Sequence, residues 1–155
     1  MEVDVEKIVR ELIDKTIHMS LATVSSDRPW VCEVHFVYDD KLNLYFRSKP
    51  SRRHSQEIAT NPRVAGNIVR QHELGEYPAA IYFEGGAAKI NDPEVQRQIF
   101  PLFEKRLGVT PAALDEAQTP DGHTFYKISV ENWYAFGKFN DTSGEKYELK
   151  WNGGQ

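Results

Sequence analysis

The spacing of apolar residues separates the chain into helical and extended segments. Apolar side chains recur at helical spacing from Val5 to Leu12, and Asp4 is of a type that caps helices, so we expect a helix over residues 4–15. The period then changes to two, and three alternating segments joined by short polar turns follow over residues 17–46. Strands joined in this way form an antiparallel meander.

The rest of the chain continues to alternate between helix and strand. We expect a short helix over residues 52–60, a strand over 64–70 and a strand over 79–90 that is interrupted by a bulge at Gly85-Gly86. A helix kinked or broken at Pro101 follows over residues 92–107, then another short helix over 110–118 and a β-rich segment over 123–139. The residues expected on the core face of the longer helix are Val95, Ile99, Leu102 and Phe103. Residues 147–151 alternate as in a possible last strand.

These elements predict an α+β fold that is mainly β. A sheet of this kind removes its exposed edges by closing into a small barrel. We expect a single domain over residues 1–155, with a tail from about residue 140.

One face of the second and third strands is apolar and the other is mixed. Cys32 lies on the apolar face, where a lone cysteine is most simply a small buried hydrophobe. Glu33, His35, Tyr45 and Arg47 share the mixed face. Two interpretations stay open for this face: a solvated surface, which the pattern favours, or the wall of a planar ligand site or subunit interface.

Composition and charge exclude several classes of protein. With 40% hydrophobic and 27% charged residues, the chain has a soluble globular composition, and its net charge of -4 argues against a general nucleic-acid binder. A single cysteine cannot form an internal disulfide, and no two histidines have the helical spacing of a zinc site, so no metal is expected. No apolar run approaches the ~20 residues of a membrane span, and the first residues resemble no signal segment. We expect a cytoplasmic protein.

The densest polar segment lies where a strand leads into a helix. Residues 46–55 hold four cationic residues, one histidine and three serines. A helix N-terminus attracts anions, and cations crowded there destabilise the helix unless an anion binds. Arginine forks match phosphate oxygens, so this segment predicts a phosphate site more strongly than a solvated basic turn.

At this point the sequence resembles the FMN-binding split-barrel family, which includes pyridoxamine 5'-phosphate oxidase. The resemblance covers roughly residues 5–139 and rests on residues 21–24, 29–32 and 38–46, and on Ser51-Arg52-Arg53-His54 and Asn61-Pro62-Arg63-Val64. It implies a six-stranded antiparallel split barrel with flanking helices. It also implies a flavoprotein oxidoreductase that is a homodimer with FMN at the subunit interface.

The resemblance further implies a set of cofactor-binding residues. Arg53 and His54 would hold the FMN phosphate with Ser51 and Arg52 close by, although the register among Arg52, Arg53 and His54 stays open. The ribityl chain would be flanked by Arg47 and Ser48. The isoalloxazine would lie along the second strand, beside Val31, Cys32, Glu33 and Val34. No catalytic residue is assigned.

Two features leave the chemistry open. The C-terminal arginine-rich signature of pyridoxamine 5'-phosphate oxidases is absent, so we expect another small-molecule substrate or a redox partner. The alternatives are a non-catalytic protein that binds or stores flavin or haem, a deazaflavin protein, and a structural dimer without ligand. The aromatic residues Trp133, Tyr134 and Phe136, together with Glu33 and His35, are candidate dimer contacts.

Overall fold

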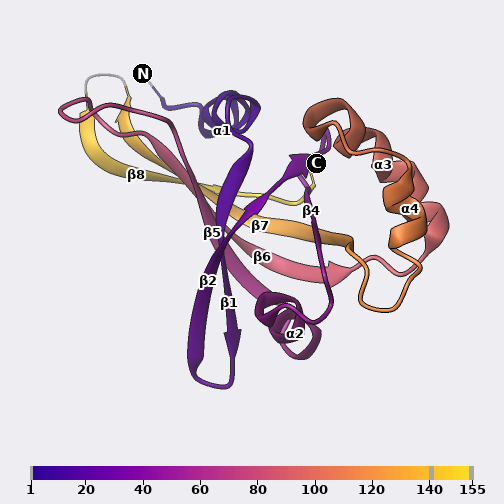
Figure 1. The fold of residues 1–155 in the computed structure, drawn as a ribbon. Coiled ribbons are helices and arrows are strands. Elements are labelled where there is room, and N and C mark those ends of the chain that lie inside the picture. The colour runs from indigo at the N-terminus through magenta and orange to yellow at the C-terminus, as the bar shows by residue number, and fades with distance from the viewer. Residues whose placement is uncertain (1, 140–141, 154–155) are drawn as a thin grey trace.

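The computed structural model describes residues 2–139 and 142–153, in which a strongly bent sheet is flanked by helices (Figure 1). The helices are α1 (Val5–Asp14), α2 (Arg53–Thr60), α3 (Pro93–Leu107) and α4 (Ala112–Glu116). The strands are β1 (His18–Ser25), β2 (Arg28–His35), β3 (Val37–Tyr38), β4 (Leu44–Ser48), β5 (Arg63–Val69), β6 (Ala80–Lys89), β7 (Thr124–Phe139) and β8 (Thr142–Lys150). This confirms the predicted α+β class.

The strands form one antiparallel sheet in the order β2-β1-β5-β6-β7-β4-β3, with β8 paired to β7. The first and last strands of this order are consecutive in the chain, because only Phe36 separates β2 from β3. The side chain of Phe36 is fully buried, and its N–H donates to the Ile17 carbonyl at 3.0 Å. The chain itself therefore closes the sheet into a barrel.

The described residues contain eight strands, and the expectation of six was low for two reasons. The predicted second strand is divided at Phe36 into β2 and β3. The segment expected as a tail forms β8, whose Leu149 lies opposite Trp133 of β7. In the described part of the chain, no helix is long and apolar enough to cross a membrane.

Two apolar clusters lie on opposite sides of the barrel wall. The larger fills the barrel and is closed by α1 and α2; its most completely buried side chains include Trp133, Phe46 and Phe83. The smaller lies beneath α3 and α4, which sit side by side on one flank in Figure 1, and it contains Phe103 and Phe125. The site described below lies between this flank and the barrel wall.

The helix α3 differs from the sequence-based expectation in two respects. Asp92 caps its start and Gly108 ends it at φ 66°, as predicted, but the helix continues through Pro101. Val95 was expected in the core and is 36% exposed. The buried face instead includes Gln96, whose amide donates to the Ile90 carbonyl at 2.8 Å. The spacing of apolar residues does not predict this face correctly, because one of its buried positions is the polar Gln96.

The predicted irregularity at Gly85-Gly86 is present, but the extra residue belongs to the opposite strand. Glu84 lies opposite Asn132 and Gly85 lies opposite Val130, so Glu131 of β7 is the bulged residue and β6 stays continuous. A Cβ atom at Gly85 would lie 2.1 Å from the Ser129 carbonyl oxygen. The glycine is therefore required by the close approach of β7.

Candidate functional site

A cavity of about 390 Å³ lies between β2, β4, the start of α2 and the end of α3. Its lining residues are Glu33, Val34, His35, Arg47, Ser48, Arg52, His54, Phe103, Leu107, Val109 and His123. Cationic and imidazole groups therefore face a floor of apolar side chains from α3 and the turn after it. The predicted site residues that the structure brings together here are Glu33, Val34, Arg47, Ser48, Arg52 and His54.

The start of α2 lacks the groups that usually cap a helix. Arg52 is its N-cap residue in an extended conformation, without a capping side chain, and the first turn holds no acidic residue. Free N–H groups and the positive end of the helix dipole thus lie beside two cavity-lining side chains, those of Arg52 and His54. This arrangement favours a bound anion.

The ring of His54 contacts Ser48, one of two buried serines that are hydrogen-bonded to each other. Its Nε2 lies 2.8 Å from Ser48 Oγ, and Ser55 Oγ donates to Ser48 Oγ at 3.1 Å. Burial, reinforced by the charge of Arg52, lowers the pKa of His54 from its ordinary value of 6.5. The free chain therefore holds a neutral imidazole at this position at neutral pH.

This pKa shift predicts how stability depends on pH. The unfolded chain binds a proton at His54 more readily than the folded chain, so the free energy of unfolding falls as the pH drops through about 6.5. In His54→Gln this contribution is missing. Urea unfolding of the flavin-free chain at about pH 7.5 and about pH 5.5 should show a larger loss for the wild type than for the variant. An equal loss in both would contradict the assignment.

Arg47 on β4 is only partly satisfied. Its Nη2 donates to Glu116 Oε2 at 2.9 Å, and its guanidinium lies 5.7 Å from the ring centroid of Phe125. The Nε atom is buried and has no hydrogen-bond partner. Such orphaned donors are rare in proteins, and this one belongs to a side chain that lines a cavity. Since Arg47 lines the cavity, the residues present fit an anionic ligand.

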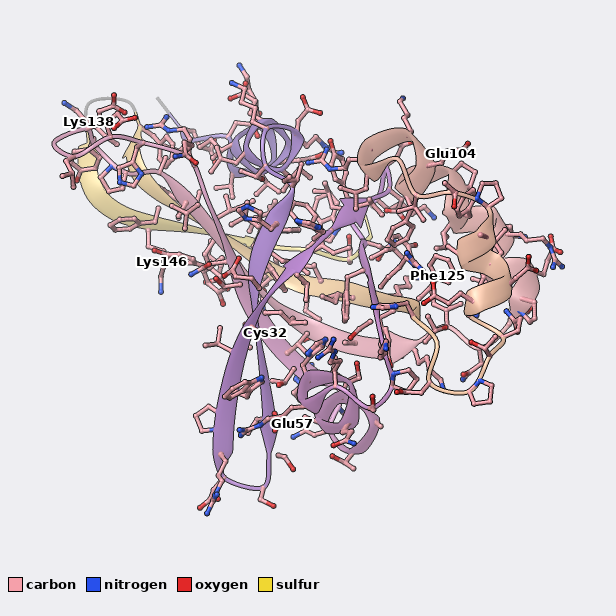
Figure 2. The ribbon with its side chains drawn as sticks, in the orientation of Figure 1. Cys32, Glu57, Glu104, Phe125, Lys138 and Lys146 are labelled. Atoms are coloured by element: carbon pink, nitrogen blue, oxygen red, sulfur yellow. The ribbon has the colours of Figure 1, made fainter. Side chains whose placement is uncertain are left out.

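Arg53 does not line the cavity. Its Nε donates to Glu57 Oε2 at 2.9 Å, and its guanidinium lies 4.1 Å from the ring centroid of Trp30. Thr23 donates to the other oxygen of Glu57 at 2.8 Å, so this group attaches the β1–β2 hairpin to α2 (Figure 2). The structure thus places Arg52 at the cavity and Arg53 at a structural contact.

The remaining predicted site residues lie outside the cavity. Ser51 donates from its backbone N–H and its hydroxyl to Asp121, at 2.9 and 2.7 Å. Val31 is 59% exposed on β2. Cys32 packs against the barrel core, and burial raises the pKa of its thiol, which disfavours the thiolate form.

The pattern favoured a solvated surface for the mixed face of the second and third strands. In the structure only part of this face is exposed. Its β2 part is exposed, and there His18 and His35 stack with ring centroids 5.9 Å apart. Its β4 part is covered, because Tyr45 is buried in the cluster beneath α3 and donates to Asp39 at 2.9 Å. The cavity lies where the two parts meet.

Two polar residues of the site were not predicted from the sequence. His123, which follows α4, lines the cavity, and its Nδ1 lies 2.8 Å from Glu116 Oε1. Both residues lie about seventy positions beyond the basic segment in the sequence, outside the motifs quoted above. The sequence held no signal for them, since only the packing of α3 and α4 brings them to β4.

Comparison with known proteins identifies the family. Residues 5–137 match the family model described as pyridoxamine 5'-phosphate oxidase. The chain belongs to this family, which confirms the resemblance noted in the sequence. A comparison with curated proteins finds no match.

Solved structures of similar fold include proteins that bind different cofactors. The haem-binding protein from Mycobacterium smegmatis has a TM-score of 0.74 at 15% identity; the alignment covers 97% of this chain and 59% of that one. HutZ, the haem storage protein from Vibrio cholerae, has a TM-score of 0.69 at 21% identity, covering 83% and 92%. A FAD-binding protein from Mesorhizobium loti has a TM-score of 0.64 at 19% identity, covering 84% and 90%. At these identities the likeness shows the split-barrel fold alone.

Proposed function

We propose that the chain is an FMN-binding oxidoreductase whose flavin occupies the cavity beside the start of α2. The observation that carries the proposal is the meeting of Arg52, His54 and the uncapped start of α2 at one cavity wall. The buried, unpartnered Nε of Arg47 supports an anion acceptor at the same site. A bound flavin would supply hydride or electron transfer, and the chain would supply binding and orientation.

The phosphate of FMN is assigned to Arg52 and His54, with Ser48 holding the His54 ring. Arg52 contributes charge, His54 contributes Nδ1 because its Nε2 contacts Ser48, and the first turn of α2 contributes N–H groups. Arg53, which the sequence made an equal candidate, is engaged by Glu57 and Trp30. We therefore propose Arg52 and His54 for the register that the sequence left open.

The isoalloxazine is assigned to the β2 side of the cavity, beside Glu33 and Val34. In the described part of the sheet, β2 ends the strand order and pairs with β1 alone. Its other edge offers backbone N–H and C=O groups to a planar polar ligand. The proposal does not extend to pyridoxamine 5'-phosphate oxidation, because Arg47, Arg52 and His54 are taken by the cofactor. A less charged substrate or a redox partner fits better.

We also propose that two copies of the chain associate with the flavin between them. The exposed apolar side chains of Trp30 and Val31 on β2 support a partner surface there, beside the predicted contacts Glu33 and His35. Trp133 is excluded as a contact, because its side chain is fully buried. We expect light scattering of the FMN-loaded protein to give the mass of two chains. A monomer that retains FMN would contradict a shared site.

The test of the proposed function is the absorption spectrum of the purified protein, before and after FMN is added and excess is removed. Retained flavin bands that bleach on addition of NADH or NADPH, or of a flavin reductase, support an oxidoreductase. Retained flavin that none of these donors reduces supports a binding or storage role. A protein that retains no flavin after reconstitution would overturn the proposal.

Haem is a second candidate ligand. Two structures of similar fold are described as haem-binding or haem storage proteins, and His35, His54 and His123 line this cavity. Imidazole is a common axial ligand of haem iron. The same spectrum distinguishes the two candidates, because added haemin would produce a Soret band whose position shifts on binding.

A further inference from the structure

Glu116, at the end of α4, clamps two cavity-lining side chains at once. Its Oε2 accepts from Arg47 Nη2 at 2.9 Å, and its Oε1 lies 2.8 Å from His123 Nδ1. Its Oε1 also accepts the backbone N–H of His123 at 3.1 Å. One carboxylate thus fixes both the backbone and the ring of His123.

This clamp decides which nitrogen of His123 carries a proton. Hydrogen bonding by the His123 side chain keeps the pKa of Glu116 below its usual range, so Glu116 is an ionised, acceptor-only group. Nδ1 must therefore donate. In the neutral ring, Nε2 is then left with a free electron pair, and this is the nitrogen that remains for a ligand in the cavity.

His35 and His54 also line the cavity, but among the described residues only the ring of His123 has a carboxylate that fixes which nitrogen accepts. Arg47 and Arg52 can only donate, and Ser48 is engaged by His54 and Ser55. Glu33, on the β2 side, already accepts a hydrogen bond from Ser20. The cavity therefore attracts the anionic group of a ligand through Arg47 and Arg52, and it offers the acceptor nitrogen of His123 to a hydrogen-bond donor elsewhere on the ligand.

We propose that His123 is the oriented hydrogen-bond acceptor of the cavity, that Glu116 is its positioning residue, and that the pair selects ligands with an N–H or O–H donor in addition to an anionic group. This inference rests on the proposed function for its ligand, because the matching donor of FMN is the imide N3–H of the isoalloxazine. The pair gives the cavity a preference that positive charge alone cannot give.

The first experiment compares the affinities of FMN and N3-methyl-FMN for the wild type and for His123→Phe. Methylation removes the donor, and it should weaken binding about tenfold in the wild type, the usual effect of leaving one polar partner unpaired. In His123→Phe, methylation should change affinity less than about twofold, because no acceptor remains. The control His72→Phe, at an exposed histidine outside the cavity, should retain the penalty. An equal penalty in wild type and His123→Phe, or its loss in both variants, would overturn the inference.

The role of Glu116 is tested by its conservative variant. Glu116→Gln keeps an oxygen that can accept from Nδ1 and should retain most of the methylation penalty, whereas Glu116→Ala should lose it. If both keep the penalty, Glu116 does not position His123. Because each result is a ratio of two ligands on one variant, a general weakening of the site cancels.

The second experiment does not depend on flavin. In ¹⁵N-histidine-labelled, flavin-free protein at about pH 8.5, well above the ordinary histidine pKa, long-range ¹H–¹⁵N spectra should place the proton of His123 on Nδ1. The His123→Phe spectrum identifies the signal. A proton on Nε2 would overturn the inference even if FMN binds. If FMN does not bind, the proposed function fails, and this measurement alone decides the inference.

Discussion

Replacing Arg52 with alanine should weaken FMN binding by about ten- to a hundredfold. The guanidinium lines the cavity at the uncapped start of α2, and a hydrogen bond to a charged group contributes about 1.5–3 kcal/mol. Riboflavin lacks the phosphate, so its affinity should be almost the same in wild type and variant. Isothermal titration of both ligands into flavin-free protein measures the effect.

Arg53→Ala is the matched control, because it removes the same side chain one position later. Arg53 contacts Glu57 and Trp30 and does not line the cavity. We expect its FMN affinity to stay within about threefold of the wild type, since the lost contacts are partly exposed ones, with Glu57 within α2 and with Trp30 on the β1–β2 hairpin. If Arg53→Ala loses FMN and Arg52→Ala keeps it, the assignment of the phosphate contacts is wrong.

Gly85→Ala should lower the free energy of unfolding by about 2–4 kcal/mol, the range for overpacking and backbone displacement at a buried position. The added Cβ would lie 2.1 Å from the Ser129 carbonyl oxygen, which belongs to the backbone of β7. One of the two strands must therefore move at the Glu131 bulge. Urea unfolding followed by circular dichroism measures the loss.

Gly86→Ala controls for the general effect of alanine in a strand. A Cβ at Gly86 would meet no atom within 4 Å. Since alanine restricts the unfolded chain more than glycine does, Gly86→Ala should change stability by less than about 1 kcal/mol. Equal losses at the two positions would show that the close approach of β7 at Gly85 is not what requires glycine.

The elements with strong local signals could be predicted from the sequence. Asp4 caps α1 by accepting from the Lys7 N–H at 3.0 Å, and Gly108 ends α3 in the left-handed conformation that glycine permits. The basic segment also lies at the start of a helix, α2, as the pattern predicted. Each of these features depends on residues within a few positions of one another.

The features that escaped prediction depend on contacts distant in sequence. Neighbouring residues of a helix point about 100° apart, so whether Arg52 or Arg53 faces the cavity depends on how α2 packs against the hairpin. The clamp on His123 requires α4 to return to β4, which no local pattern encodes. The division of the second strand at Phe36 follows from closure of the whole barrel, and Gln96 is inward because its amide binds a loop carbonyl.

The central claim is that the cavity binds FMN through its phosphate at the start of α2. A calorimetric titration of flavin-free wild-type protein with FMN and then with riboflavin tests it most directly. The account predicts saturable binding of one FMN per chain, with riboflavin bound at least about tenfold more weakly because it lacks the charged acceptor. Equal affinities for the two flavins, or no binding of FMN, would contradict it.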